Sequence, residues 1–287
     1  MSSYFAAQER ATQPGCIVLP QTAQDVSTAV ASLTNKTNSG HCQFAIRSGG
    51  HSGAADGSNI EDGVTIDLRG LDTVQVSEDR TTVSIGMGNT WDNVYSQLDP
   101  MGLAVVGGRT AGVGVGGLSL GGGISFFSTR YGWTADNIVN FEVVLADGSI
   151  VNANADEDPD LLWALRGGGN NFGVVTRVDM AAFDQGPFWG GYAYFPGDTW
   201  PQQVRELVAI NSVDDYDEYA HLTMTWGFVP GQGSVVTHQL QYTQEGVENP
   251  AVFDGILALP SFVNVLRTTT HKGFADDLAE QSPPGNR

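Results

Sequence analysis

The stretch AIRSGGHSGAADG, residues 45–57, places a single histidine, His51, among four glycines. Glycine-rich loops often bind phosphate, because backbone without a Cβ approaches a ligand closely and points its N–H groups at it. An imidazole at the centre of such a loop indicates a function in addition to phosphate binding. A strand-like run, 42–46, leads into the loop, and it is preceded by a strand at 15–20 and a helix at 22–35. This β-α-β order predicts a loop at the carboxyl end of a parallel strand, where open α/β sheets bind ligands.

Two further glycine-rich loops follow, at 107–123 and 167–173. Ten glycines fall within residues 102–123, more than tight turns explain, since each adds unfolded-state entropy without packing. Residues 112–117, GVGVGG, match the dinucleotide pattern G-x-G-x-x-G, which needs a strand directly before it and a helix directly after it. The preceding GGRTA is no strand and the following LSLGGG is a poor helix, so we expect no nicotinamide site. We expect instead that loops 47–53, 107–123 and 167–173 converge on one extended dinucleotide.

The remaining pattern predicts an α+β protein in two parts. From residue 186 glycine thins out, and long alternating strands appear beside predicted helices at 199–210 and 249–259. Such alternation is typical of an antiparallel sheet with one covered face. We therefore predict one domain over residues 1–185 and a second, partial domain over residues 186–287.

Local signals mark several element boundaries in the first part. Thr22, three residues before an aspartate, predicts a helix N-cap with a capping box. Asp147 and Gly148 lie between two alternating runs and predict a hairpin. Asp158, directly before a proline, predicts a helix that begins with a side-chain cap.

Charge and length exclude several classes of partner. The chain has 32 acidic and 13 basic residues and a net charge of −19, which disfavours nucleic acid and anionic membrane surfaces. No run of about 18 apolar residues occurs that would span a membrane. The first residues show no basic start and no apolar core of a signal peptide. Cys16 and Cys42 are too few for a disulfide scaffold; one bridge and two buried thiols are the open alternatives.

Five ordered motifs together resemble the berberine bridge enzyme-like family of FAD-linked oxidoreductases, and its fungal members most. They are IRSGGHS (46–52), VTIDLRGLDTVQV (64–76), GVGVGGLSLGGG (112–123), YGWTADNIV (131–139) with VLADG (144–148), and LLWALRGGGNNFGVVT (161–176). The likeness is close over about residues 12–185 and looser beyond. It implies a PCMH-type FAD-binding domain, the type shared with p-cresol methylhydroxylase and vanillyl-alcohol oxidase, followed by a partial substrate domain of an antiparallel sheet and helices.

The resemblance implies how the cofactor is held. His51 falls at the position joined through a ring nitrogen to the 8α-methyl of FAD, and the second attachment of many relatives, a cysteine, falls on Thr110, so we expect a single covalent link. Val113 falls where relatives carry a residue thought to control oxygen access; a small valine fits an oxidase, and simple packing is the equal alternative. Arg47 and Ser48 can donate to phosphate oxygens or fix the loop. The implied FAD-binding residues are Arg47, Ser48, Gly49, Gly50, His51, Ser52, Thr110, Val113, Gly114, Gly116, Gly117, Leu118, Gly121, Gly122, Asp136, Asn137, Ile138, Gly173 and Val175.

The implied activity is oxidation of a small alcohol, sugar or secondary metabolite by hydride transfer to the flavin, followed by reoxidation with O2 that releases H2O2. The required base is not identified, because Tyr192, Tyr194, His221 and Tyr242 lie on predicted strands where aromatic residues usually serve the core. The family usually extends well past residue 287, so we expect a truncated chain with an unpaired sheet edge. A flavin-binding remnant without turnover is the alternative. The resemblance also implies secretion.

Overall fold

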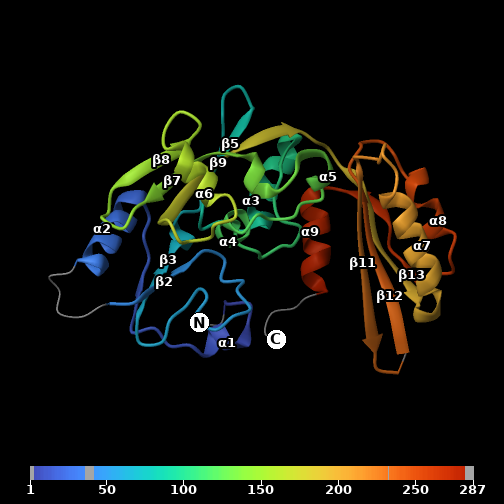
Figure 1. The fold of residues 1–287 in the computed structure, drawn as a ribbon, viewed down its shortest axis with the longest axis horizontal. Helices are drawn as coiled ribbons and strands as arrows, with labels where there is room; N and C mark the ends of the chain where they lie inside the picture. The colour runs from blue at the N-terminus through green and yellow to red at the C-terminus, as the bar shows by residue number, and fades with distance from the viewer. Residues whose placement is uncertain (1–2, 36–41, 232, 282–287) are drawn as a thin grey trace.

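The computed structural model describes residues 3–35, 42–231 and 233–281. The N-terminal part begins with α1 (Ala7–Ala11) and a small parallel sheet of order β1-β3-β2 (Figure 1). Its strands are β1 (Cys16–Val18), β2 (Phe44–Arg47) and β3 (Val64–Asp67), with α2 (Ala23–Thr34) between the first two in sequence. Both β1 and β2 run parallel to β3, so the predicted β-α-β order is confirmed and the histidine loop leaves the carboxyl end of β2. The predicted cap at Thr22 is also confirmed, as a reciprocal capping box with Asp25.

A second, antiparallel sheet of order β4-β5-β9-β7-β8, with β6 also paired to β9, completes this part. Its strands are β4 (Val74–Val76), β5 (Thr82–Gly86), β6 (Leu103–Val105), β7 (Ile138–Val144), β8 (Ile150–Asn154) and β9 (Val174–Asp184). The helices are α3 (Trp91–Leu98), α4 (Val115–Leu120), α5 (Ser128–Tyr131) and α6 (Pro159–Leu165). The predicted hairpin is β7–β8, and Gly148 takes the positive φ of 86° that its turn requires.

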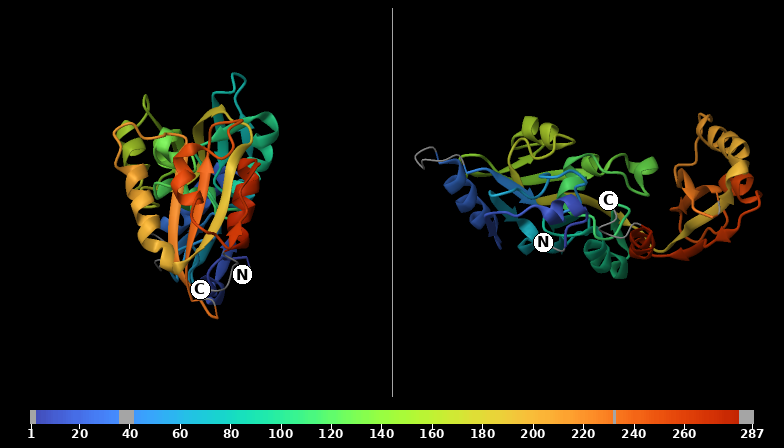
Figure 2. Two further views of the ribbon diagram at one scale, coloured as in Figure 1. Left: turned by 90° about the vertical axis from the view of Figure 1, so that its right-hand side faces the viewer. Right: turned by 90° about the horizontal axis from the view of Figure 1, so that it is seen from below.

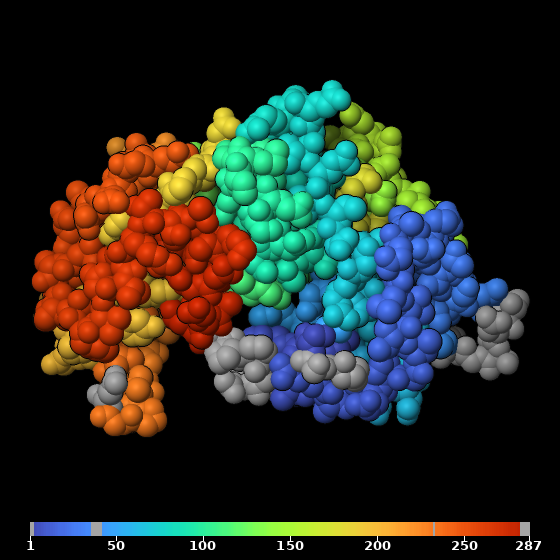
Figure 3. All heavy atoms as spheres, turned by 180° about the vertical axis from the view of Figure 1, so that it is seen from behind, coloured from blue at the N-terminus to red at the C-terminus, as the bar shows by residue number. Residues whose placement is uncertain are grey.

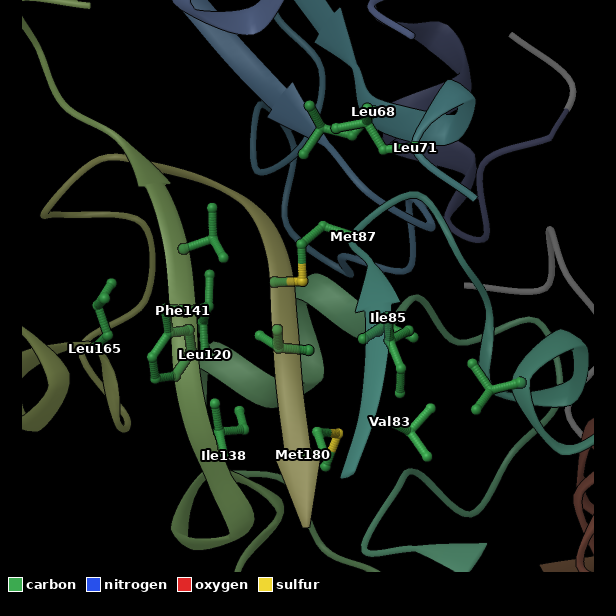
Figure 4. Close-up of a cluster of buried hydrophobic side chains, with 14 of the residues drawn as sticks. Leu68, Leu71, Val83, Ile85, Met87, Leu120, Ile138, Phe141, Leu165 and Met180 are labelled. Carbon is green, nitrogen blue, oxygen red and sulfur yellow. The ribbon is translucent and has the colours of Figure 1, made fainter. Parts of the chain in front are cut away.

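The main hydrophobic core joins these strands to the helices around them. Val83 and Ile85 of β5, Phe141 of β7 and Met180 of β9 are fully buried in one cluster (Figure 4). Leu120 of α4 belongs to the same cluster. The short helix of the glycine tract is therefore anchored to the rigid sheet, which fixes the loops on either side of it.

The C-terminal part contains a separate antiparallel sheet (Figure 2). Its strands are β10 (Phe188–Pro196), β11 (Ala220–Val229), β12 (Gly233–Tyr242), β13 (Val263–Asn264) and β14 (Arg267–Thr269), and its helices are α7 (Trp200–Asn211), α8 (Asp254–Leu257) and α9 (His271–Glu280). One sheet face packs an apolar cluster that includes Trp189, Phe195, Leu240, Phe253 and Ile256. Among the described residues β11 pairs only with β12, and Trp226 and Phe228 near its end are exposed.

Helix α9 lies at the junction of the two parts (Figures 1 and 2). It packs against both α3 and β10, and the view from behind shows it directly against the first part (Figure 3). The backbone N–H of Ala111, within the glycine tract, donates to the carbonyl of Ala275 in α9 at 2.9 Å. The tract is therefore held by the C-terminal part as well as by its own sheet.

Several local expectations are corrected. Asp158 precedes α6 as predicted, but it adopts left-handed φ and ψ of 50° and 55°, and its side chain makes no capping hydrogen bond. The helix predicted at 249–259 is reduced to a 3-10 turn at Ala251–Phe253 and the single turn of α8. Cys16 and Cys42 are both unbridged and exposed, so they are neither a disulfide nor buried thiols. Among the described residues, no helix combines the length and apolar character needed to cross a membrane.

Candidate functional site: a cavity between three glycine loops

A cavity of about 610 Å³ lies where the three glycine loops meet. This volume is within the range of about 300–1,000 Å³ usual for ligand and cofactor sites. From the predicted set, its walls contain Ser48, Gly49, Gly50, His51, Ser52, Val113, Gly114, Gly116, Gly117, Leu118, Gly121, Gly173 and Val175. Segments that are more than 100 residues apart in sequence therefore converge on one space.

The first two loops touch through glycine backbone. A Cβ built on Gly114 would lie 2.6 Å from the Cα of Gly49, and a Cβ on Gly49 would lie 2.5 Å from the Cα of Gly114. Neither loop could approach the other so closely with a side chain at these positions. A Cβ on Gly117 would meet no protein atom within 4 Å, so that glycine leaves room on the cavity wall.

Ser48 connects the histidine loop to the same tract and to the main sheet. Its Oγ donates to the carbonyl of Met87 at 2.6 Å and accepts the backbone N–H of Gly116 at 3.1 Å. The third loop is linked by the N–H of Gly169, which donates to the carbonyl of Leu120 at 3.1 Å. The central tract, 107–123, is thus held by contacts to each of the other two loops.

His51 is partly buried, and its ring stacks on that of Phe5 with centroids 3.9 Å apart and planes 21° apart. The backbone N–H of Phe5 donates to the carbonyl of Gly50 at 2.9 Å. Gly50 has a φ of 69°, a conformation that favours glycine. The N-terminal segment therefore holds the imidazole by its ring face and by the neighbouring backbone.

Arg47 does not line the cavity; it fixes the histidine loop through contacts outside the cavity wall. Its buried guanidinium lies 3.4 Å from the carboxylate of Asp67, donates to Ser3 and stacks over the ring of Tyr4 at 3.8 Å. Burial lowers the pKa of Arg47, while the charge of Asp67 opposes this shift. Of the two roles predicted for Arg47, fixing the loop is the one that its contacts support.

Five other predicted residues also lie outside the cavity wall: Thr110, Gly122, Asp136, Asn137 and Ile138. The Asp136 carboxylate accepts the backbone N–H of Trp133 at 2.9 Å, and the Asn137 amide donates to the carbonyls of Tyr131 and Trp133. Ile138 is fully buried in the main core. Both polar side chains are thus engaged within their own turn and do not reach the cavity.

Sequence reasoning missed several residues of the wall. The apolar ones include Ile46, Leu68, Met87 and Leu120. Leu68 directly follows β3 and Met87 directly follows β5, so a search for strand ends near the histidine loop would have found them. Glu9 carries no such signal: its buried Oε1 accepts the N–H groups of Gly57 and Ser58 at 2.8 and 3.1 Å, shaping the wall from behind.

The nicotinamide pattern fails for a reason that differs in part from the predicted one. A helix, α4, does begin within GVGVGG, but it ends at Leu120, so the expectation of a poor helix over 118–123 holds only for residues 121–123. The strand that precedes the tract, β6, ends at Val105 and runs antiparallel to β9. The tract is therefore not the strand-turn-helix of a parallel dinucleotide fold.

The cavity fits a flavin nucleotide on its chemistry. Glycine backbone with no side chain over it can approach a pyrophosphate, and the apolar wall suits a flat ring system. The candidate aromatic residues of the second sheet divide between its faces. Tyr242 belongs to the apolar cluster, whereas Tyr192 and His221 lie on the opposite face.

Comparisons with known proteins agree with this fit. Residues 14–154 match a family described as an FAD binding domain. An FAD-dependent monooxygenase of Cercospora beticola is 40% identical over 281 residues, which are 96% of this chain and 52% of that protein. The chain spans about half the length of the curated relatives it matches.

Solved structures share the fold. 6-Hydroxy-D-nicotine oxidase from Arthrobacter nicotinovorans has a TM-score of 0.84 at 22% identity, over 98% of this chain and 61% of its own. Xylooligosaccharide oxidase from Myceliophthora thermophila has a TM-score of 0.80 at 25% identity, over 95% of this chain and 58% of its own. With an FAD-binding domain, oxidoreductase relatives along nearly its whole length and this fold, the chain belongs to the FAD-linked oxidoreductases of the berberine bridge enzyme-like, PCMH-type family.

Proposed function

We propose that the chain binds FAD in the cavity between the three glycine loops and forms the flavin-binding part of an oxidase. The observation that carries this proposal is the convergence of loops 47–53, 107–123 and 167–173 on one cavity that includes His51. Bound FAD would supply two-electron redox chemistry that no protein side chain provides. The glycine backbone would bind the pyrophosphate, and the apolar wall would exclude water from the ring system.

His51 is the residue that we propose to bond to the flavin 8α-methyl. Its ring lies at the cavity wall, and Phe5 limits its orientation. Thr110 carries no thiol for a second attachment, so the covalent link that we propose is a single one. Val113 also lines the cavity, which supports its proposed role in giving O2 access to the flavin. The substrate class that we propose is a small alcohol, sugar or secondary metabolite, with H2O2 as the second product.

The attachment can be tested directly. Purified protein denatured in acid should retain yellow flavin fluorescence on the polypeptide, and His51→Ala should lose it while keeping its circular dichroism spectrum. Ser52→Ala, at the neighbouring wall position, is the matched control and should keep covalent flavin. Flavin that washes away from the wild type, or that stays on His51→Ala, would exclude His51 as the attachment site.

A flavin-binding chain without turnover is the second candidate, because none of the described residues is assigned as the base that oxidation of an alcohol requires. A panel of alcohols, sugars and phenolic metabolites, with peroxide as the readout, separates the two. Peroxide release that depends on His51 supports the oxidase. Silence across the panel with flavin bound supports the second candidate.

A further inference from the structure

Two neighbouring rows of the second sheet place polar side chains on one face. Tyr192, Gln239 and Thr223 face one another across β10, β12 and β11, and the next row pairs Gln241 with His221. Paired residues, and residues two apart on a strand, share a face. All five side chains therefore lie opposite the apolar cluster that α7 and α8 cover.

This polar face is buried but not satisfied. Gln241 is 1% exposed, Tyr192 4%, Gln239 6% and His221 9%. The Tyr192 Oη, the Gln239 Nε2 and both polar atoms of the Gln241 amide have no hydrogen-bond partner in the described chain. Buried polar groups are nearly always paired, so atoms such as these call for a ligand that hydrogen-bonds to them.

Arg109 reaches this face from the glycine tract. Its Nη1 donates to Thr223 Oγ1 at 3.0 Å and lies 3.3 Å from His221 Nε2. His221 is neutral, because burial, aided by the charge of Arg109, lowers its pKa to about 3. No carboxylate of the described residues lies within ion-pair distance of Arg109, although burial lowers its pKa too. Arg109 is partly buried, and a partly desolvated cation without an anion is unfavourable.

The sequence position of Arg109 ties this face to the candidate cofactor site. Val113, four residues further along the same tract, lines the FAD cavity. The N–H of Ala111, between them, is fixed by α9. A molecule bound at Arg109 would therefore lie between the second sheet and the tract that borders the cavity.

We propose that Arg109 and the polar face of Tyr192, Gln239 and Gln241 recognise a monoanionic group, a carboxylate, on the substrate. The proposal rests on the proposed function in one respect, namely that the bound molecule is the substrate. Binding of the carboxylate itself does not require flavin. A neutral polyol would satisfy the amides but would leave the Arg109 charge uncompensated. A polyanion is disfavoured, because Arg267, the other described cation on this face, is already ion-paired with Asp277 at 2.7 Å. The whole chain also carries a net charge of −19.

The probes are benzoate and its neutral isostere benzamide, titrated against the full holoprotein and followed by calorimetry. The wild type should bind benzoate at least tenfold more tightly than benzamide. Arg109→Met should reduce this preference to less than twofold, and Arg109→Lys should keep part of it. Arg205→Met makes the same charge change at an exposed position of α7 and should keep the full preference.

A second variant guards against loss of folding. Gln241→Leu removes two unpaired buried atoms, so it should fold at least as stably as the wild type yet bind benzoate several-fold more weakly. Equal affinity for the two probes, no binding of either, or an unchanged preference in a folded Arg109→Met would each overturn the proposal. A wild-type protein that prefers benzoate but takes up no flavin when FAD is added would instead contradict only the proposed function.

Discussion

The backbone of Gly114 lies so close to Gly49 that a Cβ at position 114 would come within 2.6 Å of the Gly49 Cα. Backbone atoms on both sides cannot move aside without separating the two loops. We therefore expect Gly114→Ala to destabilise the fold by roughly 1–3 kcal/mol, the usual cost of overpacking, and to abolish retention of FAD. Urea denaturation and the flavin absorbance of the purified variant measure the two effects.

Gly117→Ala is the matched control, because a Cβ there would meet no protein atom within 4 Å. Alanine in place of glycine within α4 should raise helix stability by about 1 kcal/mol. The added methyl group would, however, occupy the cavity wall, so FAD affinity should fall although the protein becomes no less stable. A Gly117→Ala protein as unstable as Gly114→Ala would show that the close approach is not the cause.

The stacking of Phe5 on His51 predicts an effect on covalent attachment. Phe5→Ala would remove the ring that stacks on the imidazole, and we expect slower formation and a smaller final fraction of covalent flavin. Phe5→Tyr keeps the ring and should behave like the wild type. The measurement is the fraction of flavin that stays on acid-denatured protein at successive times after FAD is added to flavin-free protein. Identical time courses for Phe5→Ala and Phe5→Tyr would rule out a positioning role.

The sequence predicts those features of this site that depend on the conformation of a residue and its immediate neighbours. Gly50 and Gly148 need a positive φ, and Gly49 needs a neighbour without a side chain, so glycine marks these positions directly in the sequence. Phe5 and Glu9 act on the histidine loop only through contacts that form on folding, so no sequence motif identifies them as part of the site.

The same distinction applies to the second sheet. Alternating residues predict its strands correctly, but they do not tell which face is covered. His221 is on an aromatic-rich strand where a core role is the usual one, yet it lies on the polar face because Leu222 and Met224 take the apolar side. In the sequence, nothing distinguishes Arg109 from the rest of the glycine tract. Its role follows from its contacts with His221 and Thr223 of β11, which only the fold creates.

Ser48 carries a prediction on stability alone. Ser48→Ala would leave the Met87 carbonyl and the Gly116 N–H without their shared partner. Loss of a hydrogen bond to buried backbone groups costs about 1–3 kcal/mol, so the urea midpoint should fall. Ser52→Ala removes exposed, local contacts to the carbonyl and the N–H of Ala54 and should leave the midpoint nearly unchanged. Equal midpoints for the two variants would contradict the bridging role of Ser48.

His271 predicts a pH dependence of stability. Its ring stacks on Tyr95 at 3.7 Å and packs against Phe126 and Phe127, and neither ring nitrogen has a partner in the described chain. Burial lowers its pKa from 6.5 to about 3. Below about pH 6.5, His271 therefore binds a proton in the unfolded chain but not in the folded protein. The free energy of unfolding consequently falls as the pH decreases from about 6.5 towards 3.

Each such histidine contributes up to about 1.4 kcal/mol per pH unit within that window. His221 and His238 act in the same direction, because burial lowers their pKa values to about 3 and about 4. His271→Phe fits the aromatic surroundings and removes one titrating group, so it should be at least as stable as the wild type at pH 7 and should lose stability less steeply down to pH 5. Urea denaturation at pH 8, 7, 6 and 5 measures both slopes. Between pH 8 and 7 the free energies of unfolding of the two proteins should change with pH to the same extent. If they also do so down to pH 5, His271 is not held neutral by the fold.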